Sequence, residues 1–127
     1  MYGIEMGGGL LNVVARGNVL ESNSWGIYFF HNTRWGNRIT ENYVRNSTNI
    51  GIHMHDVSGT HFISENIVSG TLDTGIEARL SFDIMISGNI ITDSGMRSIF
   101  LNNSGRCKLY SNEVGNIGIT LRVTSSD

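Results

Sequence analysis

The segment Ile63-Ser64-Glu65-Asn66-Ile67-Val68 is one copy of a pattern that runs along the whole chain. In each copy an Asn is followed two residues later by an aliphatic residue, and an Ala, Ile or Leu stands three residues before the Asn. The copies are separated by 24, 24, 23 and 23 residues and lie at Asn18/Leu20, Asn42/Val44, Asn66/Val68, Asn89/Ile91 and Asn112/Val114. A constant period of this length is typical of a solenoid repeat protein.

A second marker keeps the same period. It is a Gly-Ile-x-apolar motif, and it occurs at Gly3-Ile4, Gly26-Ile27, Gly51-Ile52 and Gly75-Ile76, with related copies at Ser98-Ile99 and Gly118-Ile119. Each period contains three short stretches of two-residue alternation, separated by Gly, Asn, Ser and Thr, which is the pattern of three strands. The sequence therefore predicts an all-β, right-handed, single-stranded parallel β-helix of about five and a half coils, forming a single domain over residues 1–127.

The five Asn residues have a predicted structural role. Asn tolerates left-handed backbone angles, so we expect it to mark a tight bend. Stacked inside the solenoid, each amide can also bond to the Asn of the next coil, forming an internal ladder. The alternative is a leucine-rich repeat, because the run Ile84-x-Ile86-x-x-Asn89-x-Ile91 fits that pattern. Scarce leucine and a Gly-Ile-x-apolar strand in place of a helical return favour the β-helix.

Composition narrows the class of partner. Charged residues make up 16% of the chain and the formal net charge is −2, so no basic footprint points to nucleic acid. The longest apolar stretches, such as Ile27 to Phe30, are too short to span a membrane. The single Cys107 excludes an internal disulfide framework and a cysteine-rich zinc site. The sequence predicts no metal site and no cofactor.

Alternation also predicts which side chains point outward from the Gly-Ile strands. The first outward column reads Glu5, Tyr28, His53, Glu77, Phe100 and Thr120, and the second reads Gly7, Phe30, His55, Arg79, Asn102 and Arg122. His31 and Asp56 follow in the loops. Aromatic rings and guanidinium groups gathered on one outer surface are suited to bind a ligand. We therefore expect a substrate-binding face that includes His53, Tyr28, Phe30, Glu77 and Asn102.

The repeat resembles the pectate-lyase-like β-helix proteins over essentially all of the chain. That resemblance implies a secreted, periplasmic or virion-surface protein whose strand-and-loop face binds an acidic polysaccharide. The superfamily includes polysaccharide lyases, hydrolases, uronate epimerases and tailspikes, so the fold alone does not name a reaction.

One local match is sharper. The run Gly51-Ile52-His53-Met54-His55-Asp56-x-Ser58 resembles a region of bacterial alginate C5-epimerases, and the similarity continues to Gly75-Ile76 and Arg79. The resemblance implies that His55 is the catalytic base, Asp56 its neighbour and Arg79 the group that neutralises the substrate carboxylate. His53 and Met54 stand where that family has Asp and Pro.

Other readings of the same residues remain open. His53 and His55 can be a solvated surface pair or a metal pair with only two protein ligands, and Tyr28 and Phe30 can close an oligomer contact. A structural module such as a tailspike shaft, or a designed or truncated solenoid, would leave this face inert. On the third strand, an outward apolar stripe is expected to be covered by a partner, at Val19, Tyr43, Ile67 and Ile90, with Glu113 in the last coil. Bare solenoid ends further predict a homo-oligomer, or a fragment that stacks on more coils.

Overall fold

The computed structural model describes residues 1–115 and 117–122, which form three parallel sheets. Sheet A contains the Gly-Ile strands β1 (Tyr2–Gly7), β4 (Trp25–Asn32), β7 (Ile52–Val57), β10 (Thr74–Arg79), β13 (Arg97–Asn102) and β16 (Ile119–Arg122). Sheet B contains the strands before each repeated Asn, β2 (Val14–Arg16), β5 (Arg38–Thr40), β8 (His61–Ser64), β11 (Ile84–Ser87) and β14 (Lys108–Tyr110). Sheet C contains β3 (Val19–Glu21), β6 (Tyr43–Arg45), β9 (Ile67–Ser69), β12 (Ile90–Thr92) and β15 (Glu113–Val114).

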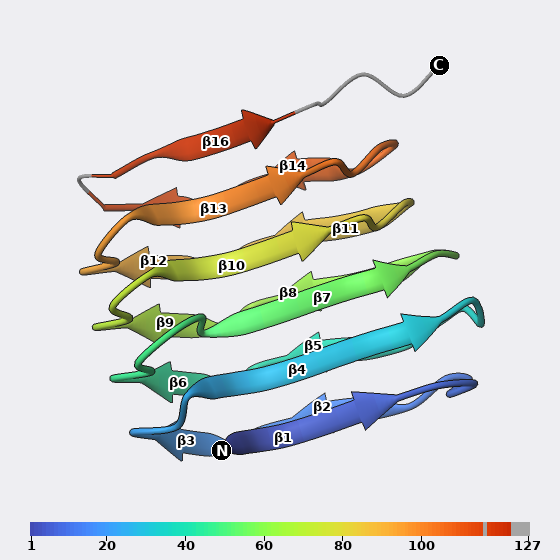
Figure 1. Ribbon diagram of the computed structural model, residues 1–127, viewed down its shortest axis with the longest axis horizontal. Helices are drawn as coiled ribbons and strands as arrows, with labels where there is room; N and C mark the ends of the chain where they lie inside the picture. Colours follow the sequence, from blue (N-terminus) through green and yellow to red (C-terminus); the bar gives the residue numbers. More distant parts are fainter. Residues whose placement is uncertain (116, 123–127) are drawn as a thin grey trace.

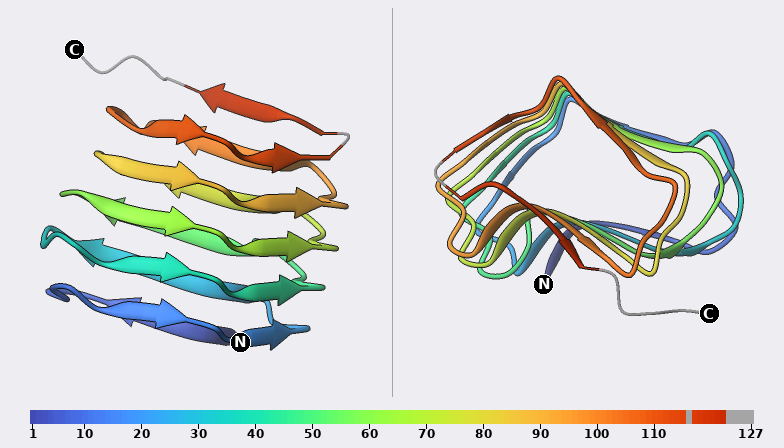
Figure 2. Two further views of the ribbon diagram at one scale, coloured as in Figure 1. Left: turned by 180° about the vertical axis from the view of Figure 1, so that it is seen from behind. Right: turned by 90° about the horizontal axis from the view of Figure 1, so that it is seen from above.

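Each coil passes through sheets A, B and C in turn and then rises to the next coil (Figure 1). Every strand pair is parallel and joins neighbouring coils, and the path rises in a right-handed sense from the N-terminus. The view along the axis shows the coils superimposed around one interior (Figure 2). The predicted β-helix is confirmed. The leucine-rich alternative is wrong, since the return segments of the described coils are strands.

The core consists of columns of similar apolar side chains stacked from coil to coil. Ile27, Ile52, Ile76 and Ile99 form one fully buried column in sheet A. A second column in the same sheet alternates in size, with Met6, Phe29, Met54, Ala78 and Leu101. Burying a side chain of this size stabilises the fold by roughly 2 kcal/mol. Stacking thus supplies the continuous core that a single coil cannot form.

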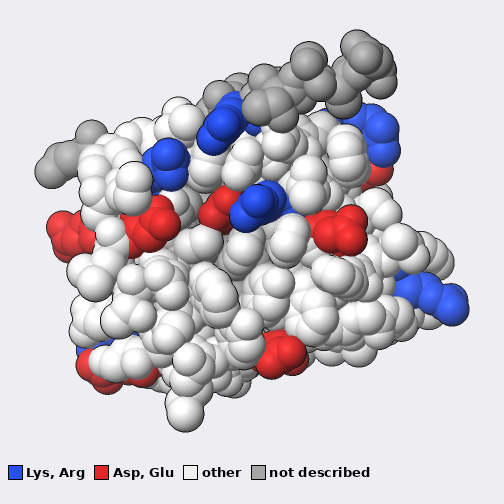
Figure 3. Space-filling view, viewed as in Figure 1, with Lys and Arg blue, Asp and Glu red and all other residues white. Residues whose placement is uncertain are grey.

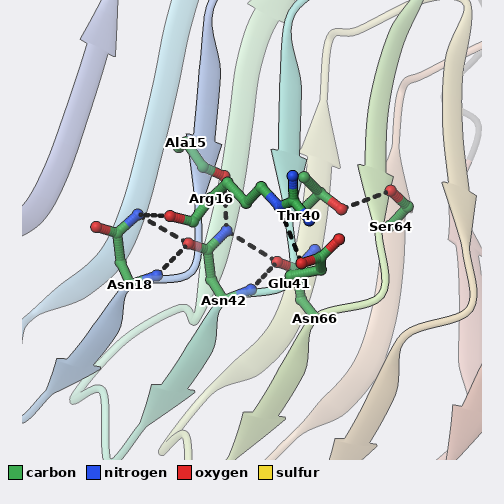
Figure 4. A network of polar contacts seen from close by, with 8 residues as sticks. All are labelled: Ala15, Arg16, Asn18, Thr40, Glu41, Asn42, Ser64 and Asn66. Atoms are coloured by element: carbon green, nitrogen blue, oxygen red, sulfur yellow. Dashed lines mark hydrogen bonds and ion pairs between the residues drawn. The ribbon is translucent and has the colours of Figure 1, made fainter.

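The predicted Asn ladder is present inside the solenoid (Figure 4). The Nδ2 atom of Asn42 donates to Oδ1 of Asn66 at 3.0 Å, and Asn18 donates to Asn42 in the same way at 2.9 Å. Each internal amide also donates to a carbonyl of the preceding coil, as Asn66 does to that of Ile39. Its Oδ1 accepts a backbone N–H as well, so the buried amide has partners on both sides.

The bend lies one residue before the predicted position. The left-handed residues are those that precede the Asn, namely Gly17, Glu41, Glu65, Gly88 and Ser111, with φ between 55° and 69°. The prediction that Asn itself takes the left-handed conformation was wrong. The Asn backbone N–H is held by the Oδ1 of the next coil's Asn, so the chain reverses at the residue before it.

A second left-handed column lies where sheet A ends. It includes His31, Asp56, Leu80 and Asn103, with φ between 49° and 55°. A left-handed residue other than Gly costs about 1 kcal/mol. The repetition of this conformation in coil after coil shows that the corner is built into the repeat, and it turns the chain from sheet A toward sheet B.

The Gly of the Gly-Ile motif is required by close packing. A Cβ at Gly26, Gly51 or Gly75 would overlap a branched side chain of sheet C and a carbonyl of the next coil. None of the described residues belongs to a helix that could cross a membrane. Residues 116 and 123–127 of the predicted domain lie outside the described part.

Candidate functional site

The outer face of sheet A carries both predicted columns in the expected register. Tyr28 pairs with His53, and His53 with Glu77, along the first column. Phe30, His55, Arg79 and Asn102 follow one another along the second. Figure 3 shows that the charged groups of this face lie mainly over its middle and upper coils, while the lower coils are largely uncharged. The residues predicted for the site therefore share one face of sheet A, and their role in binding or catalysis remains a prediction.

Six rings on this face form what we call the ring stack, made of Tyr2, Trp25, Tyr28, Phe30, His53 and His55. Tyr2 and Trp25 have ring centroids 4.8 Å apart, and Tyr28 and Phe30 are 4.9 Å apart, all with nearly parallel planes. His53 stacks on Tyr28 at 5.3 Å and on His55 at 5.7 Å. Since the rings cover one another's faces, the stack offers mainly ring edges and polar atoms to a ligand.

His53 is the least solvated member of the stack. It is 7% exposed, and neither ring nitrogen has a hydrogen-bond partner. Burial lowers its pKa from 6.5 to about 4, with smaller contributions from His55 and the Arg79 guanidinium. The imidazole is therefore neutral near pH 7, with both nitrogens unpaired in a site closed on most sides.

His55 lies further out, next to three other polar groups. Its Nδ1 is 3.3 Å from the Tyr28 hydroxyl, and its ring meets the His31 ring edge-on at 6.0 Å. Partial burial lowers the pKa of His55, and the nearby Arg79 and His31 lower it further. Asp56, an exposed residue near the end of β7, acts in the opposite direction and raises this pKa. In the described part of the chain, the Asp56 carboxylate hydrogen-bonds to no imidazole.

Glu77, Arg79 and Asn102 complete the predicted set on β10 and β13. Burial raises the pKa of Glu77, which is only 8% exposed and accepts a long hydrogen bond of 3.5 Å from Asn102. Arg79 pairs in register with His55 and is exposed. Within the described residues, no carboxylate lies at ion-pair distance from Arg79. The structure thus brings His55 and Arg79 together on adjacent strands with the guanidinium available.

Two members of the ring stack were missed from the sequence. Tyr2 and Trp25 each stand directly before the Gly of a Gly-Ile motif, where simple alternation places them inside. In the structure it is the Gly that faces the interior, where a Cβ would meet Leu20 at Gly3 and Val44 at Gly26. The two rings therefore lie outside against Tyr28. An aromatic residue before the motif in the first two repeats was the available signal.

His61 is a histidine of a different kind. It is fully buried, with Nε2 3.0 Å from the Ser58 carbonyl oxygen and Nδ1 3.4 Å from Asn37 Nδ2. The edge-on ring of Phe29 completes its surroundings. Both nitrogens therefore have partners, and the residue stabilises the corner between sheets A and B.

The apolar stripe predicted on sheet C does face outward. Val19 is 67% exposed, Ile67 44% and Ile90 38%. Cover by a partner chain remains a prediction. Among the described residues, no cluster of three or more His, Cys, Asp or Glu side chains could hold a metal ion.

These features define a parallel β-helix solenoid with one face rich in aromatic and titratable side chains. The chain belongs to the NosD family, since residues 10–127 match the family described as "Periplasmic copper-binding protein (NosD)". The periplasmic family agrees with the secreted or periplasmic location that the sequence predicted. No curated protein and no solved structure matches the chain. The more specific likeness to pectate lyases and alginate epimerases remains a prediction.

Proposed function

We propose that the outer face of sheet A binds an acidic polysaccharide and that His55 and Arg79 act on its uronate units. The observation that carries the proposal is the exposed Arg79 guanidinium beside a neutral His55, on adjacent strands and in register. A guanidinium without a protein carboxylate can bind a uronate carboxylate through two parallel hydrogen bonds. Tyr28, Glu77 and Asn102 are then available for hydroxyl groups, and His53 for a group that enters the ring stack.

The chemistry available to this pair is proton abstraction next to the carboxylate. When Nδ1 of His55 donates to the Tyr28 hydroxyl oxygen, Nε2 carries the lone pair. Nε2 would take the C5 proton, and the electron pair of the broken C–H bond would move into the carboxylate held by Arg79. Return of a proton to C5 completes an exchange or an inversion, whereas loss of the C4 substituent completes a lyase reaction.

Hydrogen exchange in D₂O tests this proposal. Polyuronates of both the mannuronate and galacturonate type are incubated with the protein, and deuterium at C5 is followed by NMR. We expect exchange by the wild type, its loss with binding retained in His55→Ala, and roughly tenfold or greater loss of binding in Arg79→Ala. Arg45→Ala on sheet C is the matched control, because that arginine pairs with Glu21 away from the face. Equal behaviour of the two arginine variants would overturn the proposed role of Arg79.

Copper, which the family's description implies, does not fit the histidines of this face. The His53 and His55 rings are parallel within 4° at 5.7 Å, so their in-plane lone pairs cannot converge on one ion. His31 meets His55 edge-on and completes no three-ligand site. Titration with Cu(I) and Cu(II) checks this, and tight stoichiometric binding that His55→Ala abolishes would contradict it.

A structural role is the second candidate, and the observation behind it is the exposed stripe of sheet C. Val19, Ile67 and Ile90 lie at one register position on successive strands and could pack against another chain. Light scattering after gel filtration measures the assembly state. Under this alternative the wild type is an oligomer that Ile67→Lys dissociates, and no polyuronate binds.

A further inference from the structure

The structure contains a second, separate groove on the outer side of sheet B. We call it the tryptophan groove, and its lining side chains are Asn12, Val14, Trp35, Arg38, Thr60 and Phe62. Its volume is about 330 Å³, which lies at the small end of the range for ligand sites. At the corner between sheets A and B, the first three coils (blue, cyan and green) reach further from the axis than the two that follow (Figure 2). The groove belongs to these wider coils and shares no lining residue with the ring stack.

Trp35 offers what the ring stack lacks, an uncovered aromatic face. Its side chain is 61% exposed, and no other aromatic ring of the described residues stacks on it. The adjacent Gly36 has φ of +79°, and a Cβ at that position would overlap Oδ1 of Asn12. The Asn12 amide therefore lies against Gly36, and it lines the groove together with Trp35. A flat apolar surface bordered by an amide suits a sugar ring, which has C–H groups on its faces and hydroxyls on its edge.

Arg38 gives the groove its charge. The guanidinium carbon lies 4.6 Å from the centroid of the Phe62 ring on the neighbouring strand, within the range of a cation–π contact that holds the group in place. Within the described residues, no carboxylate lies at ion-pair distance from Arg38, and none lines the groove. The same outward column continues through Met85 to a second cation, Lys108. A fixed guanidinium with unused edge donors is suited to bind a carboxylate through two hydrogen bonds.

From these three features we infer that the tryptophan groove is a subsite for a uronic acid unit. The sugar ring lies on Trp35, its carboxylate on Arg38, and its hydroxyls reach Asn12 and Thr60. The inference rests on the proposed substrate class but not on the catalytic pair, because groove and pair lie on different sheets. A polysaccharide held here would be anchored to the module outside the reacting site.

Tryptophan fluorescence tests the groove directly. The chain has two tryptophans, so Trp25→Phe leaves Trp35 as the only indole. In this background the protein is titrated with trimers of galacturonate and mannuronate, with neutral galactose and mannose trimers, and with decanoate as an aliphatic carboxylate. We expect the uronate trimers to change the Trp35 emission saturably, and the neutral trimers and decanoate to bind at least tenfold more weakly.

Variants then separate the contribution of each group. Arg38→Ala is expected to weaken uronate binding roughly tenfold to a hundredfold and to abolish the preference over neutral sugar. Arg16→Ala is the matched control, because this exposed arginine of the same sheet is paired with Glu41. Circular dichroism melts confirm that both variants fold. Equal loss in both, equal binding of neutral trimers, equal binding of decanoate, or no saturable change overturns the inference.

The outcome is distinguishable from failure of the proposed function. Arg79→Ala should leave the Trp35 titration unchanged while removing C5 exchange. If exchange persists in the wild type but Trp35 never responds, the groove inference fails alone. If Trp35 responds to uronates but no exchange occurs, the groove stands and the catalytic proposal fails.

Discussion

Two columns of polar side chains run along this solenoid, and they differ in how completely their polar atoms are hydrogen-bonded. The Asn ladder lies inside, and each of its internal amides donates and accepts hydrogen bonds with neighbouring coils. The column Tyr28–His53–Glu77 lies on the outer face of sheet A. There His53 is almost as buried as the ladder, yet its nitrogens have no partner.

The difference separates a stabilising column from one that can act on a ligand. A buried polar group that is fully bonded strengthens the fold, whereas an unbonded one costs about 1–3 kcal/mol. The solenoid repeats the first arrangement in every coil. The second arrangement occurs at His53, where both ring nitrogens lack a partner beside the half-buried His55 and the exposed Arg79. Such unsatisfied groups concentrate at functional sites.

The largest expected effect comes from breaking the ladder at its centre. Asn66→Ala removes the partner of the Asn42 amide, frees the Ile39 carbonyl and leaves Oδ1 of Asn89 without its side-chain donor. We expect a loss of about 3 kcal/mol or more in the free energy of unfolding, measured by urea denaturation. Asn18→Ala, at the partly exposed end of the ladder, should cost clearly less. Equal losses would show that the ladder does not act as a buried column.

Acidification should lower the free energy of unfolding through His53. The folded-state pKa of His53 is about 4, below its unfolded value of 6.5, so only the unfolded chain takes up this proton between those values. Protonation therefore favours the unfolded chain, and the free energy of unfolding falls by up to about 3 kcal/mol as pH drops from above 6.5 to below 4. Unfolding free energies of wild type and His53→Phe across this window measure it. The difference between them should change with pH, and a constant difference would contradict the assignment.

At pH 7 the two buried histidines should respond oppositely to the same substitution. His53→Phe removes two unsatisfied nitrogens and keeps a stacked ring, so its effect should be within about 1 kcal/mol of zero or stabilising. His61→Phe removes contacts to Ser58 and Asn37 and should destabilise by about 2 kcal/mol. Thermal unfolding followed by circular dichroism compares them. A larger loss for His53→Phe would reverse the contrast.

Glu77→Gln should give a smaller change of the opposite pH sign. Burial raises the pKa of Glu77, so the stability that its protonated form contributes is present at low pH and is lost as pH rises through the folded-state pKa. The amide variant should therefore melt slightly higher than the wild type at pH 7, and the gain should disappear near pH 4. Differential scanning calorimetry at both pH values measures it, and a gain that grows on acidification would be inconsistent with this sign.

Among these substitutions, we expect the smallest change in stability from breaking the exposed ion pair between Arg16 and Glu41. Its atoms are 2.9 Å apart, but both side chains are at least half exposed. Arg16→Ala should therefore change the free energy of unfolding by less than about 0.5 kcal/mol in the same urea assay. A loss comparable with that of Asn66→Ala would mean that surface pairs, and not the ladder, hold adjacent coils together.

The repeat was enough to predict the period, the three strands of each coil and the direction of most side chains. Those features follow from local alternation and from the recurrence of Asn and Gly-Ile, which need no knowledge of distant contacts. It also placed His55 and Arg79 on adjacent strands, because residues one period apart become neighbours once the coils stack.

Which polar groups find hydrogen-bond partners could not be predicted, because it depends on how the coils stack. His53 and His61 look alike in the sequence, but stacking leaves one unbonded and gives the other two contacts. The bend fell one residue before Asn because bonds between coils fix the Asn backbone. Trp25 stacks on Tyr2 of the neighbouring coil, whereas Trp35 is 61% exposed. Each outcome depends on the side chains one coil above and below, and these meet only when the coils assemble.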